Sequence, residues 1–208
     1  MLAKKLSTQE QLDEKKLLQG MSLGDYKAFS TLYEIHVAQL TNYALKFTPD
    51  LQIIEDSIHD IFVWLWNNRS QLEISWSIKA YLFKSIRTSI LAKIQKSKKV
   101  VLFHGVDEED VAGFIMSGEE KYLETEGQFG LKGKIADALS SLTSKQKEVV
   151  YLRFYQGLSF DEIATNMNLT TKACYKLMGR AVSELRKSCS LSWQYDFLFF
   201  LFFLQFMG

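Results

Sequence analysis

Apolar residues recur at helical spacing through the first half of the chain. They fall three or four positions apart in three stretches, over residues 29–47, 51–65 and 78–95. This spacing places the apolar side chains of each stretch on one face of a helix. The first stretch ends just before Pro49, which cannot continue a helix. We therefore expect three amphipathic helices in this half of the chain.

A different set of local signals follows Leu158. Ser159 is a favourable N-cap, and Glu162, three residues later, completes a capping box. Asn168 tolerates the left-handed backbone of a tight turn. Leu169 would fill the angle between two helices, and Thr170 can cap the second of them. These signals predict a short helix, a tight turn and a longer helix.

A further helix is expected upstream, over residues 143–154. Thr143 and Gln146 form a second possible capping box at its start. Gly157 lies just past its end, where glycine commonly closes a helix. Together with the two helices after it, this segment predicts a helix-turn-helix domain.

The longer helix of this domain has two distinct faces. One face is apolar and the other carries hydroxyl, aromatic and cationic side chains, which suit the phosphates and base edges of a major groove. An ordinary helical hairpin with a solvated basic face is the alternative. The apolar face comprises Cys174, Leu177, Met178, Ala181 and Leu185. The face predicted to bind DNA comprises Thr171, Lys172, Tyr175, Lys176 and Arg180.

The first half of the chain also carries a basic and aromatic segment. No acidic residue occurs between Glu73 and Asp107. Cations there can follow phosphates and aromatic rings can stack on unpaired bases, so the mixture favours single-stranded nucleic acid over duplex. Solvated lysines around core aromatic residues are the alternative. The segment contains Trp76, Lys79, Tyr81, Phe83, Lys84, Arg87, Lys93, Lys96, Lys98 and Lys99.

The helix before this segment is acidic on the side opposite its apolar face. Glu55, Asp56, His59 and Asp60 lie on that side. Asp56 and Asp60 are four residues apart, where like charges repel by a few tenths of a kcal/mol. An acidic strip beside a basic one indicates two partners, one of them a protein, although a solvated helix face explains the strip equally well.

Composition divides the chain into domains and a linker. Residues 100–133 contain eight acidic residues, and five glycines lie between Gly113 and Gly133, which predicts a flexible acidic linker. The expected organisation is therefore a helical domain over 20–99, a linker over 100–133, a helix-turn-helix domain over 134–187 and an apolar tail over 188–208. The predicted fold class is all-α, with two small helical domains.

Overall composition narrows the function classes. The 208 residues are 47% hydrophobic with a single Pro, which favours a globular helical protein. Cys174 and Cys189 form no disulfide framework, and the polar N-terminus carries no signal peptide, so a reducing cytoplasm is expected. The three histidines are scattered and no catalytic or metal motif occurs. We expect no enzyme activity, no metal and no cofactor.

The tail ends in an unusually apolar run. Residues 193–207 would span roughly 22 Å as a helix, short of the roughly 30 Å of a bilayer core. A spanning helix is therefore not expected. Packing against its own domains and binding a protein partner both remain open, and a membrane-surface anchor is the less favoured interpretation.

These motifs together resemble bacterial RNA polymerase sigma factors of the extracytoplasmic-function type, in the sigma-70 family. The first half resembles the promoter-melting domain in residues 28–33, 55–66 and 79–87. The second half resembles the domain that binds the upstream promoter element, in residues 142–154, 157–164 and 180–186. The two blocks in this order are strongly specific for the family.

The resemblance implies roles for matching positions. Glu55, Asp56 and Asp60 would dock on the clamp of core RNA polymerase. The helix-turn-helix residues would read the −35 element in the major groove. The resemblance also assigns single-stranded −10 DNA to Asn67, Trp76, Lys79, Tyr81, Lys84, Arg87 and Thr88.

The function expected from the resemblance is to direct core RNA polymerase to promoter DNA and to help melt it. Two alternatives stay open: a helix-turn-helix regulator that acts without polymerase docking, and a helical adaptor that binds only proteins. The resemblance further implies a membrane-associated anti-sigma partner, which would hold the cytoplasmic protein at the inner membrane.

Overall fold

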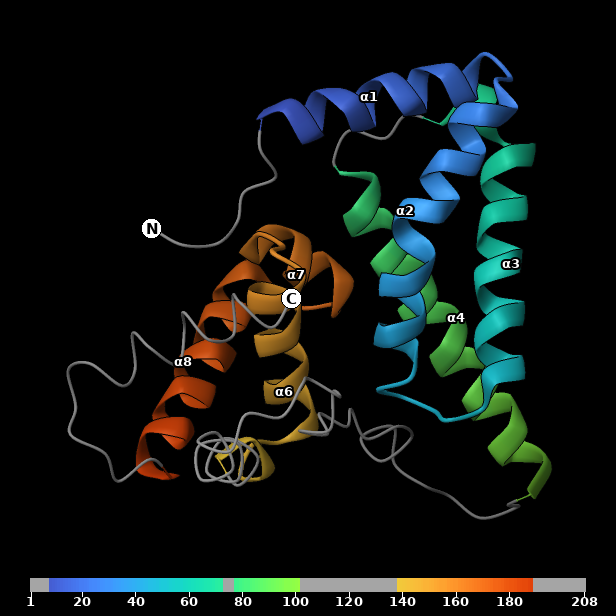
Figure 1. Cartoon of the computed structure of the whole chain (residues 1–208). Helices are drawn as coiled ribbons and strands as arrows, with labels where there is room; N and C mark the ends of the chain where they lie inside the picture. The colour runs from blue at the N-terminus through green and yellow to red at the C-terminus, as the bar shows by residue number, and fades with distance from the viewer. Residues whose placement is uncertain (1–7, 73–76, 102–137, 189–208) are drawn as a thin grey trace, which may run out of the picture. The chain divides into compact units, whose positions relative to one another are not determined.

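The described part of the chain folds into helices (Figure 1). The computed structural model describes residues 8–72, 77–101 and 138–188. The chain divides into two compact units. The first contains α1 (Thr8–Ser22), α2 (Tyr26–Ala44), α3 (Leu51–Asn67), the short helix η1 (Arg69–Gln71) and α4 (Ile78–Val101). The second contains α6 (Ser144–Val150), η3 (Tyr151–Tyr155), α7 (Phe160–Asn166) and α8 (Thr171–Ser188).

Helix α2 is the centre of the first unit, since α1, α3 and α4 all pack against it. Its Tyr43 is fully buried, with its ring 5.0 Å from that of Phe83 on α4 and 5.1 Å from that of Phe47. Each buried aromatic side chain removes a large apolar area from water. The other fully buried large side chains here are Met21, Leu40, Ile54, Leu65, Ile78, Leu82, Ile86 and Ile90.

The three helices predicted for this half are confirmed, and a fourth precedes them. Helix α1 begins at Thr8, before the predicted start of the domain at residue 20. Its sequence is mostly polar, and Met21 near its end is its one fully buried residue among those with described side chains. The apolar pattern on which a helix prediction relies is therefore weak over α1.

Local side chains set where these helices begin. The Asp25 carboxylate accepts a hydrogen bond from the Lys27 amide at the start of α2. At the start of α3, Asp50 accepts from the amides of Gln52 (3.1 Å) and Ile53 (3.2 Å). Gly24 takes φ +88°, a conformation open to glycine, and so allows the tight turn between α1 and α2.

In the second unit, α8 packs across α6 and α7. Leu152, Ile163, Cys174 and Ala181 are fully buried there. The expected helix over 143–154 begins as predicted, because the Thr143 and Gln146 capping box forms in both directions. From Tyr151 to Tyr155, however, the helix widens to a π-helical turn, in which the Gln156 amide bonds the Tyr151 carbonyl. The predicted helix is thus present, with π-helical geometry over its last turn.

The all-α prediction is confirmed, while several other predictions lie outside the described residues. These are the acidic linker, the apolar tail and Trp76. Among the helices that the structure describes, none combines the length and the apolar character needed to cross a membrane.

Candidate nucleic-acid interface

The turn between α7 and α8 is built by the residues that the sequence indicates. The Ser159 hydroxyl accepts from the Glu162 amide (3.3 Å), and the Glu162 carboxylate accepts from the Ser159 amide (2.7 Å). Asn168 adopts φ +55°, and the Leu169 amide then bonds the Ala164 carbonyl at 2.8 Å. These hydrogen bonds fix the direction in which the chain leaves α7, and hence the angle at which α8 begins.

Helix α8 is held on one face and exposed on the other. The Thr170 hydroxyl accepts from the Ala173 amide at 3.1 Å and caps the helix as predicted. Cys174, Met178, Ala181 and Leu185 are buried, and Leu177 is half-buried. Lys172, Tyr175, Lys176 and Arg180 are exposed, so the predicted cationic face is present.

Thr171 differs from the other members of this face. Its hydroxyl donates a 2.8 Å hydrogen bond to the Asp161 carboxylate on α7. The side chain is half-buried, and the bond ties the first turn of α8 to the first turn of α7. Thr171 therefore positions the helix in this structure, whereas the sequence assigned it only to DNA.

An aromatic and cationic stack supports Tyr175 from below. The Tyr175 ring lies 4.1 Å from that of Phe160, centroid to centroid. The Arg153 guanidinium lies 5.0 Å from the Phe160 ring centroid and donates to the Leu158 carbonyl at 2.8 Å. Sequence reasoning missed Arg153 and Phe160, because nothing local links the π-helical turn to α8. Tyr175 remains 57% exposed on this support.

Cys174 lies beneath the cationic face and serves in packing. Burial and the nearby Asp161 carboxylate both raise the pKa of its thiol. The thiol is therefore neutral near pH 7 and packs as a small apolar side chain.

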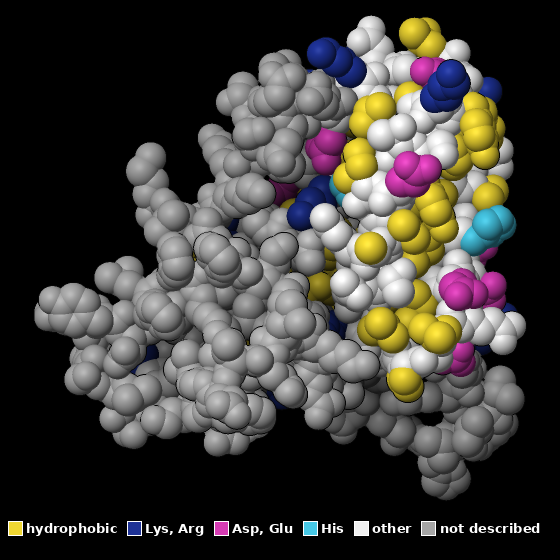
Figure 2. All heavy atoms as spheres, viewed as in Figure 1, with side chains coloured by type: hydrophobic (Ala, Val, Ile, Leu, Met, Phe, Trp, Pro, Cys, Tyr) yellow, Lys and Arg dark blue, Asp and Glu magenta, His cyan; other side chains and the backbone are white. Residues whose placement is uncertain are grey.

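The acidic strip predicted on α3 is exposed. Glu55, Asp56, His59 and Asp60 all face solvent, and Figure 2 shows acidic side chains beside hydrophobic ones on the part of the surface over α2 and α3. The Asp60 carboxylate is not isolated, because it lies 2.9 Å from the Lys93 ammonium of α4. The two side chains are 64% and 31% exposed respectively. Lys93 thus neutralises one end of the strip.

The residues predicted to bind single-stranded DNA follow the end of α3 and the first turns of α4. Asn67 and Thr88 are exposed, while Lys79, Tyr81, Lys84 and Arg87 are half-buried. The Thr88 hydroxyl donates to the Lys84 carbonyl at 2.9 Å. Lys84 and Thr88 therefore share one side of the helix, one turn apart.

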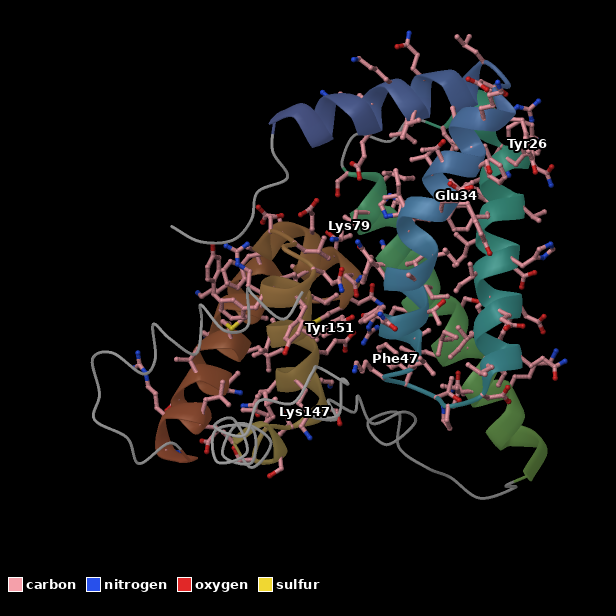
Figure 3. All side chains as sticks on the ribbon, viewed as in Figure 1. Tyr26, Glu34, Phe47, Lys79, Lys147 and Tyr151 are labelled. Atoms are coloured by element: carbon pink, nitrogen blue, oxygen red, sulfur yellow. The ribbon has the colours of Figure 1, made fainter. Side chains whose placement is uncertain are left out.

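Lys79 is turned toward the core of its domain. It lies in the first turn of α4 (Figure 3), and its ammonium is 5.9 Å from the Phe83 ring centroid. Burial, together with the Lys79 charge, lowers the pKa of His36 on α2 to about 4. His36 is 2% exposed and lies 3.7 Å from the Glu14 carboxylate of α1. Lys79 is thus part of the packing between α2 and α4.

The segment after α3 is braced by a cluster of aromatic rings. The Arg69 guanidinium lies 4.4 Å from the Trp66 ring centroid and donates to the Trp66 carbonyl at 2.7 Å. Tyr26, at the start of α2 in Figure 3, packs its ring edge against Trp66 at 5.9 Å. Phe29 adds a further ring 5.0 Å from Trp66. The end of α3, where Asn67 is predicted to bind single-stranded −10 DNA, is therefore anchored to α2.

The described residues offer no metal site, since no group of three or more His, Cys, Asp or Glu side chains gathers among them.

Comparison with protein families gives two matches in chain order. The sigma-70 region 2 model matches residues 32–100, and the sigma-70 region 4 model matches residues 132–185. The first match runs from within α2 to the last turn of α4, and the second includes α6, η3, α7 and most of α8.

Curated relatives extend the same similarity over most of the chain. The ECF RNA polymerase sigma factor SigL of Mycobacterium tuberculosis is 23% identical over 173 residues, covering 80% of this chain and 92% of SigL. The RNA polymerase sigma factor CnrH of Cupriavidus metallidurans is 24% identical over 169 residues, covering 78% of this chain and 86% of CnrH.

Solved structures share the fold. The structure of CnrH in complex with the cytosolic domain of CnrY matches with a TM-score of 0.54 and 19% identity, covering 84% of this chain and 96% of that one. The sigma factor RpoE from Bartonella quintana, in complex with the anti-sigma factor NepR, matches with a TM-score of 0.54 and 18% identity, covering 80% and 99%.

Proposed function

The chain belongs to the sigma-70 family of RNA polymerase sigma factors, of the extracytoplasmic-function type, and we propose that it directs core polymerase to promoters through three separate surfaces. The observation that carries this proposal is the presence of regions 2 and 4 in order, over residues 32–100 and 132–185. Two weak DNA-binding surfaces joined through polymerase reach a useful affinity, because the second binding event becomes intramolecular once the first has occurred.

The first surface is the exposed face of α8, which reads the −35 element in the major groove. Lys172, Lys176 and Arg180 supply cations for phosphates and for guanine edges, and Tyr175 is exposed on the same helix. The capping bond at Ser159 and the turn at Asn168 support this role, because they hold the helix at a fixed angle.

The second surface lies at the end of α3 and along the start of α4, where it holds the melted −10 strand. Asn67, Lys84 and Thr88 present polar and cationic groups along it, together with Tyr81 and Arg87. Lys79 supports this surface from within the domain, since its ammonium lies over Phe83.

The third surface is the acidic strip of α3, which docks on the polymerase clamp. Glu55, Asp56 and Asp60 are exposed on it. Carboxylates in this position repel DNA and so keep the docking surface distinct from the two DNA surfaces.

An anti-sigma protein is the regulatory partner that the proposal includes. Both solved structures named above hold a sigma factor in complex with a second protein, CnrY in one and the anti-sigma factor NepR in the other. If the anti-sigma partner of this chain is membrane-associated, as we propose, it would hold the protein in the cytoplasm, at the inner membrane, until a signal releases it.

Run-off transcription with purified core polymerase tests the proposal. Asp56→Ala combined with Asp60→Ala should weaken binding to core polymerase and abolish specific transcripts, while Gln52→Ala, an exposed and uncharged neighbour on α3, should leave both unchanged. Equal transcription by the double variant and the control would refute docking through the acidic strip.

A further inference from the structure

An exposed tryptophan lies where α3 meets α4, at a position that the proposed DNA surface does not yet include. Trp64 is 48% exposed, which is unusual for a large aromatic side chain of a small domain. Its ring stacks on that of Tyr81, with the centroids 6.1 Å apart and an interplanar angle of 25°. The two rings therefore form a nearly parallel pair that is open to solvent on the Trp64 side.

The pair joins the hydrogen-bonded end of α3 to a half-buried residue of α4. The Trp64 carbonyl accepts from the Asn68 amide at 3.0 Å and from the Asn68 side chain at 2.8 Å, which closes the end of α3. On α4, Tyr81 is half-buried, and burial raises the pKa of its phenol while a hydrogen bond with the Ser85 side chain opposes the rise. An exposed ring that already stacks on a half-buried neighbour loses less conformational entropy when a ligand stacks on it than an unsupported ring would.

The charged groups beside the Trp64–Tyr81 pair differ between α4 and α3. Lys84 and Thr88 follow Tyr81 on the same side of α4, one and two turns along. Asp60 lies one turn before Trp64 on α3, but its carboxylate is paired with Lys93 at 2.9 Å. The surroundings of the rings are thus cationic and polar, which is the setting in which aromatic side chains stack on unpaired bases.

We propose that Trp64 and Tyr81 together form a stacking platform for a base at the edge of the melted promoter segment. This inference rests on the proposed function, and adds Trp64 to the surface made by Asn67, Tyr81 and Lys84. The exposed face of Trp64 receives the base, Tyr81 supports the ring from behind, and Lys84 faces the phosphate. The platform stabilises the open state of the promoter and has no part in docking on polymerase.

The test compares Trp64→Ala with Trp64→Phe, and uses Val63→Ala as a matched control because Val63 is 42% exposed on the same turn of α3. Holoenzyme reconstituted with each variant is mixed with a duplex promoter that carries 2-aminopurine in its −10 segment. Fluorescence reports strand opening, run-off transcription reports its product, and a separate titration reports affinity for core polymerase.

Trp64→Ala should lower the amount of open complex by about fivefold or more. Fivefold is the lower end of the range expected for losing one base–aromatic stack. Trp64→Phe should retain most of the activity, and Val63→Ala all of it. The deficit of Trp64→Ala should shrink on a premelted template, because strand separation no longer depends on the stack. Affinity for core polymerase should be the same for all three variants and the unaltered protein.

Two results would overturn the inference. Weaker polymerase binding by Trp64→Ala would make Trp64 a docking residue, and unchanged opening by a folded Trp64→Ala would leave it without a role. Thermal unfolding of each variant establishes that it is folded, and Trp64→Phe keeps the comparison valid if the Ala variant is not. Absence of transcription by the unaltered protein would instead refute the proposed function, so the two failures are distinguishable.

Discussion

The cationic faces of α8 and α4 look alike in sequence but differ in structure. On α8, Lys172, Lys176 and Arg180 are exposed and project from a helix fixed by its buried face. On α4, Lys79 lies over Phe83, and Lys93 is paired with Asp60. Cations that already interact with Phe83 or Asp60 are less available to DNA, so the comparison leads us to expect that the α8 face contributes more to DNA binding than Lys79 and Lys93 do.

The largest expected effect tests the exposed face of α8. Replacing Lys172, Lys176 and Arg180 together by Ala should lower transcription from a duplex promoter by at least ~100-fold, since each loses an interaction with a base or phosphate worth about 1 kcal/mol or more. The slope of DNA binding against salt should also become shallower, by about 0.9 for each phosphate that is no longer neutralised. Holoenzyme binding at a series of salt concentrations measures both.

Lys79→Ala provides the contrast on α4. Because Lys79 packs within its domain, this variant should lower transcription several-fold at most and should mainly change stability. A loss of transcription as large as that of the α8 variant would show that the cations of α4 and α8 act alike, and would contradict the difference between the two faces.

The next largest effect is a pH dependence of folding stability, which is expected for the N-terminal domain and not for the helix-turn-helix domain. His36 has its pKa lowered to about 4 by burial first and by Lys79 second, so the unfolded state binds its proton more readily than the folded state. Stability of the N-terminal domain should be complete above about pH 6.5 and should fall by up to ~3 kcal/mol as the pH decreases toward 4. Urea unfolding between pH 7 and 4.5 measures this.

His36→Leu should remove that pH dependence, whereas His59→Leu, at an exposed position of α3, should not. The described helix-turn-helix residues contain no histidine, so unfolding of that domain should lack the same transition. A His36→Leu protein with unchanged pH dependence would contradict this assignment.

A smaller effect is expected at the caps of the helix-turn-helix domain. Ser159→Ala and Thr143→Ala each remove a side-chain bond to a helix amide and should lower stability by about 1 kcal/mol. Ser159→Ala should also weaken DNA binding more than Thr143→Ala does, because Ser159 begins the helix that leads into the turn. Thermal unfolding and promoter binding of the two variants would show whether that difference exists.

The smallest effect is expected for the Lys93–Asp60 pair. Since both side chains are partly exposed, Lys93→Ala should lower stability by less than about 1 kcal/mol. Exchanging the charges with Asp60→Lys and Lys93→Asp should restore stability while weakening polymerase binding, because the carboxylate leaves α3. Recovery of full polymerase binding by the exchanged pair would argue against a role for Asp60 in docking.

The difference between local and long-range interactions explains which parts could be predicted from the sequence. Ser159, Asn168 and Thr170 act on backbone groups within four residues, so their types and spacing suffice. The apolar face of α8 follows from its period, and three helices of the first domain follow in the same way. These features can be predicted without knowing which helices pack against one another.

What the sequence could not predict depends on interactions between distant segments. The Thr171 bond to Asp161, the Arg153–Phe160–Tyr175 stack and the Trp64–Tyr81 stack each join different helices. Helix α1 was missed because its pattern is polar, and the π-helical turn was missed because the capping signals mark only where α6 begins. These interactions decide which exposed residues remain available for binding.

The most direct test of promoter recognition through polymerase compares DNA binding by the protein alone with binding and transcription after core RNA polymerase is added. We predict weak binding alone, and with polymerase a specific transcript whose upstream and melted segments are both protected in a footprint. Tight duplex binding without polymerase, together with no transcript when polymerase is added, would contradict this prediction and indicate a regulator that uses only the helix-turn-helix domain.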